Sequence, residues 1–87
     1  YSQRITNGII ENIREDSSVG WTMEIINAAD WSTAKEKWMA KSASTSINME
    51  QALIMKDGEI IPQEELKAGD RLFIVRKGYY ARFVIVK

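Results

Sequence analysis

An aromatic pair near the end of this sequence stands among basic residues. Tyr79 and Tyr80 follow Arg76 and Lys77, and Arg82 comes two residues later. Single-stranded nucleic-acid binders use such residues, because bases stack on aromatic rings at about 1–3 kcal/mol per base while cations attract the phosphates. These five residues are therefore the candidate nucleic-acid site of the sequence.

Several features make nucleic acid the alternative rather than the preferred ligand. Twelve Lys and Arg balance twelve Asp and Glu, so the net charge is zero, whereas dedicated nucleic-acid binders carry a basic excess. The last hairpin turn and the DSSVG turn are short. Strand alternation also groups Arg76 with Leu72 and Ile74 but Arg82 with Val84 and Val86, so the two cations need not share one face. The favoured interpretation is a barrel hairpin with basic edges, which discourage edge-to-edge strand pairing.

Two tryptophans bracket the least regular part of the chain. Trp31 and Trp38 flank the segment STAKEK. The favoured interpretation is that they clasp this segment onto the fold, with each indole N–H hydrogen-bonded. The alternative is a platform on which sugars or bases stack. If the chain binds a ligand, the residues expected to contact it are Trp31, Trp38, Tyr79, Tyr80 and Arg82.

Catalysis is not predicted. The chain has no histidine and no cysteine, so its serines lack an activating imidazole, and cysteine nucleophiles and Cys/His zinc sites are excluded. A Ser-Lys pair at Lys41 and Ser42 carries little weight, because both residue types are common here. Paired acids such as Glu15-Asp16 and Glu64-Glu65 are expected in turns or at a helix start, where they are solvated. We expect neither an enzyme nor a cofactor.

A metal site is not predicted either. The oxygen-bearing side chains at 16–18 lack the spacing of a calcium loop. Methionines can bind copper(I), but Met23, Met49 and Met55 alternate with apolar neighbours, a pattern typical of core packing.

The elements that must position these residues are mainly strands, because alternation with period two dominates the sequence. Asn7-Gly8 is expected to bend or bulge the first strand. Residues 29–43 are expected to form a long loop or a ragged hairpin. Pro62 and Gly69 bound a short helix of one or two turns. The expected strands cover residues 4–15, 21–28, 44–56, 59–61, 71–75 and 81–86, and the segment 44–56 is long enough for one bent strand or two short ones.

Five main strands with a helix between the third and the fourth follow the order of an oligonucleotide/oligosaccharide-binding (OB) barrel. An SH3-like barrel is the alternative, since it also combines five short strands with a helical turn. The long first strand and the position of the helix favour the OB fold. The sequence therefore predicts an all-β, five-stranded OB-like barrel forming a single domain over residues 1–87.

The stretch LIMKDGEIIPQEELKAGDRLFIVRKG resembles small OB-like accessory domains of exported, uncharacterised bacterial proteins of clostridial type. In those domains a DG turn leads into an L-K-x-G-D corner and a closing hairpin, and ITNGIIENIRE and the Trp31 segment fit more loosely. In physical terms, Leu66 can plug the barrel end, Gly69 can adopt a left-handed conformation and Asp70 can accept hydrogen bonds from turn amides.

The resemblance implies an accessory binding or spacer module, cut from a longer chain and located outside the cytoplasm. Its implied partner is the rest of its parent chain, with a protein or glycan ranked before nucleic acid. No apolar run of the sequence approaches the length of a membrane span, so no membrane insertion is expected.

Overall fold

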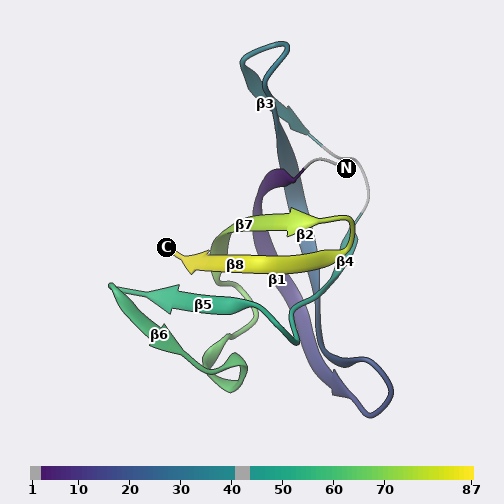
Figure 1. The fold of residues 1–87 in the computed structure, drawn as a ribbon, viewed down its shortest axis with the longest axis vertical. Helices are drawn as coiled ribbons and strands as arrows, with labels where there is room; N and C mark the ends of the chain where they lie inside the picture. Colours follow the sequence, from purple (N-terminus) through teal and green to yellow (C-terminus); the bar gives the residue numbers. More distant parts are fainter. Residues whose placement is uncertain (1–2, 41–43) are drawn as a thin grey trace.

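In the computed structural model, which describes residues 3–40 and 44–87, eight strands form one sheet that closes into a barrel-like ring (Figure 1). One 3-10 turn, η1 (Gln63–Glu65), precedes the last hairpin. The all-β, barrel-like prediction is confirmed. The strands are β1 (Arg4–Asp16), β2 (Gly20–Ser32), β3 (Lys37–Ala40), β4 (Thr45–Asn48), β5 (Leu53–Lys56), β6 (Glu59–Ile61), β7 (Arg71–Lys77) and β8 (Tyr80–Val86).

The long first strand organises the ring. β1 pairs antiparallel with β2 along one edge and with β7 along the other. β2 also pairs with β4, β7 pairs with β8, and a parallel bridge between Asn48 and Tyr80 joins β4 to β8. The ring therefore runs β1-β2-β4-β8-β7, and β5 and β6 extend the sheet beyond β8.

Gly8 permits the bend of β1 that the sequence predicts. The pairing of β1 with β2 shifts register between Asn7 and Ile9, as in a β-bulge. A Cβ atom built on Gly8 would overlap Cγ2 of Ile25 in the core. The glycine is therefore required because β1 and β2 approach closely at this point.

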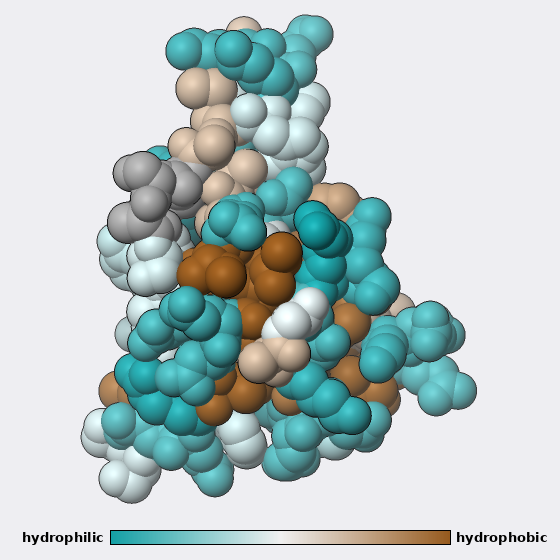
Figure 2. Space-filling model, turned by 180° about the vertical axis from the view of Figure 1, so that it is seen from behind, coloured by the Kyte–Doolittle hydropathy of each residue, from teal (hydrophilic) through white to brown (hydrophobic). Residues whose placement is uncertain are grey.

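Inward-facing side chains of the strands fill the barrel. The inward-facing residues of β7 and β8 are buried, and Ile74 and Val84 are completely so. Met23 and Met49 are buried as predicted, but the core prediction for Met55 is wrong, since this side chain is 37% exposed on β5. Seen from the side opposite to Figure 1, apolar residues also reach the surface near the middle of the molecule, with hydrophilic residues around them (Figure 2).

The predicted corner before β7 is present, although its helix is only the 3-10 turn η1. Leu66 is buried at the barrel end, and Gly69 has a φ of 96° in the left-handed region. The Lys67 amide donates to Oδ2 of Asp70 at 3.0 Å. The Gly69 amide donates to the Ile10 carbonyl at 2.7 Å, which fastens the corner to β1.

The segment around the tryptophans is a hairpin, in agreement with one of the two structures expected there. β2 continues to Ser32 and pairs with β3, and this hairpin forms an arm that projects from the barrel (Figure 1). Lys41 and Ser42 lie outside the described residues. The segment 44–56 forms two short strands, β4 and β5, which is one of the two structures expected there.

A bulge in β8 overturns the predicted alternation around Arg82. The register of β7 and β8 shifts between Val75 and Arg76, so that Arg82 has no opposite residue in this ladder. Val84 and Val86 are buried whereas Arg82 is exposed. The prediction that these three residues share a face is wrong, because the extra residue of a bulge resets the side-chain alternation.

Candidate binding cleft

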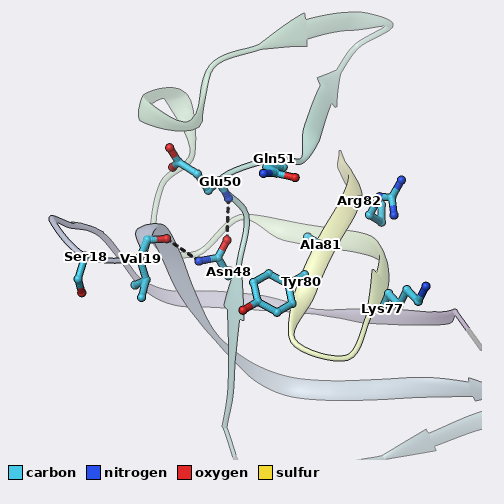
Figure 3. A pocket seen from close by; sticks show the side chains of 9 residues that line it. All are labelled: Ser18, Val19, Asn48, Glu50, Gln51, Lys77, Tyr80, Ala81 and Arg82. Atoms are coloured by element: carbon cyan, nitrogen blue, oxygen red, sulfur yellow. Dashed lines mark hydrogen bonds between the residues drawn. The ribbon is translucent and has the colours of Figure 1, made fainter. Parts of the chain in front are cut away.

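A cleft of about 770 Å³ opens beside the β4–β8 bridge (Figure 3). Three parts of the chain border it: the turn between β1 and β2, the segment that follows β4, and the hairpin of β7 and β8. Its size is within the range of about 300–1,000 Å³ that is usual for ligand pockets. The lining residues are Ser18, Val19, Asn48, Glu50, Gln51, Lys77, Tyr80, Ala81 and Arg82.

Asn48 ties the three walls of the cleft together. Its side-chain amide donates to the Val19 carbonyl at 2.6 Å, and its Oδ1 accepts from the Glu50 amide at 3.0 Å (Figure 3). Its backbone amide donates to the Tyr79 carbonyl at 2.7 Å. The turn of β1 and β2 and the closing hairpin are thus fixed relative to each other through one residue.

Glu50 is held in place by the start of β2. Its carboxylate accepts the Trp21 amide at 3.0 Å and lies over Gly20, where a Cβ atom would overlap it. Neither Asn48 nor Glu50 was predicted from the sequence as a cleft residue. The available signal was the Asn-Met-Glu spacing at 48–50, since an asparagine often bonds the amide two residues ahead.

Two residues of the preferred ligand set, Tyr80 and Arg82, meet in this cleft, together with Lys77 of the nucleic-acid alternative. Lys77, Tyr80 and Arg82 all line it, and the Tyr80 residue is 65% exposed. The Tyr80 ring lies next to Asn48, and the two cations project from the hairpin on its other side (Figure 3). Tyr79 is 68% exposed at the turn, where Gly78 has a φ of 62°, but it does not line the cleft.

Arg76, the remaining residue of the nucleic-acid alternative, is buried and points into the fold. Its Nε donates to Oγ1 of Thr6 at 2.8 Å, and its Nη1 donates to the Gly78 carbonyl at 2.7 Å. Its Nη2 donates to both carboxylate oxygens of Asp30 at 3.2 Å. Arg76 therefore holds the last turn onto β1 and β2 and is not available to a ligand in the cleft.

The tryptophans lie on the projecting arm, away from the cleft. The Trp31 and Trp38 rings meet edge to face with centroids 5.5 Å apart. Trp38 also stacks on Phe73 of β7, with centroids 5.9 Å apart. The Trp38–Phe73 contact joins the arm to β7 of the barrel, and each tryptophan keeps 38% of its surface exposed.

Asp16 shapes the turn that forms one wall of the cleft. Its Oδ1 accepts from the Ser18 hydroxyl at 2.6 Å, the Ser18 amide at 2.7 Å and the Val19 amide at 3.3 Å. These bonds, the one from the Ser18 hydroxyl above all, lower the pKa of Asp16 below its ordinary value of 3.8 because they stabilise the carboxylate.

We expect the Asp16 carboxyl to titrate below pH 3.8 in the folded protein. Because the folded pKa is lowered, the bonds of this turn stabilise the fold above the ordinary carboxyl pKa and are lost as pH falls through the lowered value. Carbon-detected NMR of Asp16 and the Ser18 amide shift measure the midpoint. Ser18→Ala should raise it toward 3.8, and an unchanged midpoint in that variant would contradict the assigned cause.

No family model matches this chain, and no significant match is found among curated proteins or solved structures. Within the described residues, no helix is long and apolar enough to cross a membrane. The same residues contain no cluster of three or more acidic, histidine or cysteine side chains placed to hold a metal ion. The cleft is therefore the feature on which a functional proposal rests.

Proposed function

We propose that this chain is a non-catalytic binding module with OB-type connectivity, carried by a larger exported bacterial protein. The order around the ring supports OB connectivity, because β8, the last strand, lies between β4 and β7 rather than at the end of a meander. The 3-10 turn between β6 and β7 occupies the position of the expected helix.

The position of the cleft carries the proposal. OB barrels bind ligands on the face of their second and third strands, between the loops joining strands one to two and four to five. In this chain the corresponding loops are the turns at 17–19 and 78–79. Ser18 and Val19 of the first turn line the cleft, and so do Lys77 and Tyr80, which flank the second, together with Asn48 at the end of β4. The lining combines hydrogen-bonding side chains, an exposed ring and two cations, which suits a polar ligand such as a glycan or a peptide segment.

Tyr80→Ala tests the cleft against a matched neighbour. We expect this variant to weaken ligand binding by at least about fivefold, since loss of a stacking ring costs about 1–3 kcal/mol. Tyr79→Ala removes an equally exposed ring that does not line the cleft, and it should leave affinity nearly unchanged. Amide NMR titrations with soluble oligosaccharides, short peptides and a mixed-sequence single-stranded oligonucleotide provide the readout. Equal losses in the two variants, or shifts confined to residues outside the cleft, would refute the proposed site.

Single-stranded nucleic acid is the second candidate ligand, because Lys77, Tyr80 and Arg82 line the same cleft. If both cations contact phosphates, the slope of log affinity against log salt should be about −1.4, or roughly 25-fold weaker binding for tenfold more salt. Arg82→Ala should reduce that slope by about 0.7. Binding that does not respond to salt would exclude this candidate and leave the glycan or peptide ligand.

A further inference from the structure

Strands β1, β7, β8, β5 and β6 leave apolar side chains on the outside of the barrel. Neighbours in the registers of these strands fall into two adjacent rows. We call them together the outer apolar face, and no residue of it lines the cleft. One row is Phe73, Ile85, Met55 and Ile60, and the other is Ile5, Val75, Phe83 and Leu53.

The outer apolar face is accessible except at Val75 and Phe73, which are half-buried, and the Trp38 ring of the projecting arm stacks on Phe73. Phe83 and Ile85 are 46% and 47% exposed, and Ile60 is 67% exposed. Val84, which lies between Phe83 and Ile85 in the chain, points inward and is fully buried. Phe83 and Ile85 are therefore the outward-facing residues of a regular alternation. Scattered apolar residues are normal on protein surfaces, but two adjacent rows of them across five strands indicate an interaction surface.

Positive charge borders this face on one side. One step beyond the Leu72–Val86 pair, the Lys87 amide donates to the Arg71 carbonyl at 2.9 Å, which places Arg71 and Lys87 in the next outward row. The Lys87 ammonium lies 4.1 Å from the centre of the Phe73 ring. The two apolar rows themselves contain no acidic residue. A partner that covers the apolar rows therefore meets cations at their border.

We propose that the outer apolar face binds an amphipathic helix of a partner protein, with Asp or Glu residues bordering its apolar stripe. A helix satisfies its own backbone hydrogen bonds, whereas an extended peptide lying flat on apolar side chains would leave backbone groups unpaired. Five strands at about 4.8 Å spacing extend for roughly 19 Å, which a helix of about 13 residues covers.

The positive charge beside the outer apolar face favours a helix with acidic residues over a second copy of this chain as the partner. A second copy would present the same apolar rows and the same cations, and its face would offer no acidic residue to pair with Arg71 and Lys87. Acidic residues beside the apolar stripe of a helix instead pair with this border. The partner chemistry is thus apolar at the centre and acidic at one flank.

A pair of designed peptides tests this proposal. Each is a helix-forming sequence of about 14 residues with leucines at positions i, i+3, i+4 and i+7, bordered by glutamates in one peptide and by lysines in the other. We expect the glutamate peptide to bind at least roughly tenfold more tightly and to shift the amides of β5 and β8. Combining Arg71→Glu with Lys87→Glu should reverse this preference.

Surface variants locate the binding and keep the test independent of folding. Phe83→Ser and Ile85→Ser should each weaken the glutamate peptide by at least about fivefold. Tyr79→Ser removes a more exposed ring outside the face and should not change binding. The proposal is overturned if neither peptide binds, if sedimentation shows a dimer that Phe83→Ser abolishes, or if vesicles of anionic lipid bind through this face while the peptides do not.

Discussion

Asp30→Ala is expected to lower the free energy of unfolding by about 3–5 kcal/mol, because it would leave the buried Arg76 guanidinium without its carboxylate partner. Arg76 is 4% exposed, and its side chain bonds β1, β2 and the last turn through Thr6, Asp30 and Gly78. Loss of the Asp30 carboxylate therefore leaves the positive charge of Arg76 buried and uncompensated. Urea unfolding followed by tryptophan fluorescence measures the change.

Arg4 supplies the control for this prediction, since it contacts the same carboxylate from the surface. Its Nη1 lies 3.4 Å from Oδ2 of Asp30, and its side chain is 61% exposed. Arg4→Ala should cost no more than about 1 kcal/mol, as is usual for an exposed ion pair. The combination of Asp30→Leu with Arg76→Met should be more stable than Asp30→Ala alone, because it removes both charges. Similar losses for Asp30→Ala and Arg4→Ala would show that the burial of Arg76 is not decisive.

Gly8→Ala is expected to destabilise the protein by about 1–3 kcal/mol through overpacking. The new methyl group would overlap Cγ2 of Ile25, and the Ile26 carbonyl oxygen would lie only 3.3 Å away. Strands β1 and β2 would have to separate or change register at the bulge. Because alanine is ordinarily a mild substitution, a large loss reports the close approach of the two strands.

A double-mutant cycle identifies the cause of that loss. In an Ile25→Ala background the overlapping methyl is absent, so Gly8→Ala should cost clearly less than in the original chain. Asn12→Ala, at an exposed position of the same strand, should change stability by less than about 0.5 kcal/mol. Equal costs of Gly8→Ala in both backgrounds would assign the effect to the backbone of β1 instead of Ile25.

Local patterns predicted most of the strands and turns. Asp57-Gly58 forms the expected tight turn, with φ values of 54° and 80°, because this dipeptide tolerates the left-handed region. The corner at 66–70 was predicted for the same kind of reason. The bulge at Arg82 was not predictable in this way, unlike the one at Gly8, because it depends on how β8 pairs with β7 and leaves no separate mark in the sequence.

The cleft was predictable only on one side. Lys77, Tyr80 and Arg82 form a local cluster that composition reveals, whereas Asn48 reaches Val19 across 29 positions of the chain. The environment of Arg76 was also only partly predictable from the local sequence. Alternation correctly placed it with inward-facing residues, but its pairing with Asp30, 46 positions away, depends on the barrel closing.

The barrel is closed between β4 and β8 by the Asn48–Tyr80 bridge. Among the described residues it is the one pairing between β4 and β8, whereas β1 and β2 share a long ladder. Few backbone hydrogen bonds must break to separate β4 from β8. We therefore expect local opening of the barrel, and exchange of backbone amide hydrogens with solvent, to begin between these two strands. Because the cleft includes both Asn48 and Tyr80, a bound ligand would contact both sides of this bridge. Ligand binding would therefore stabilise the closed barrel against local opening.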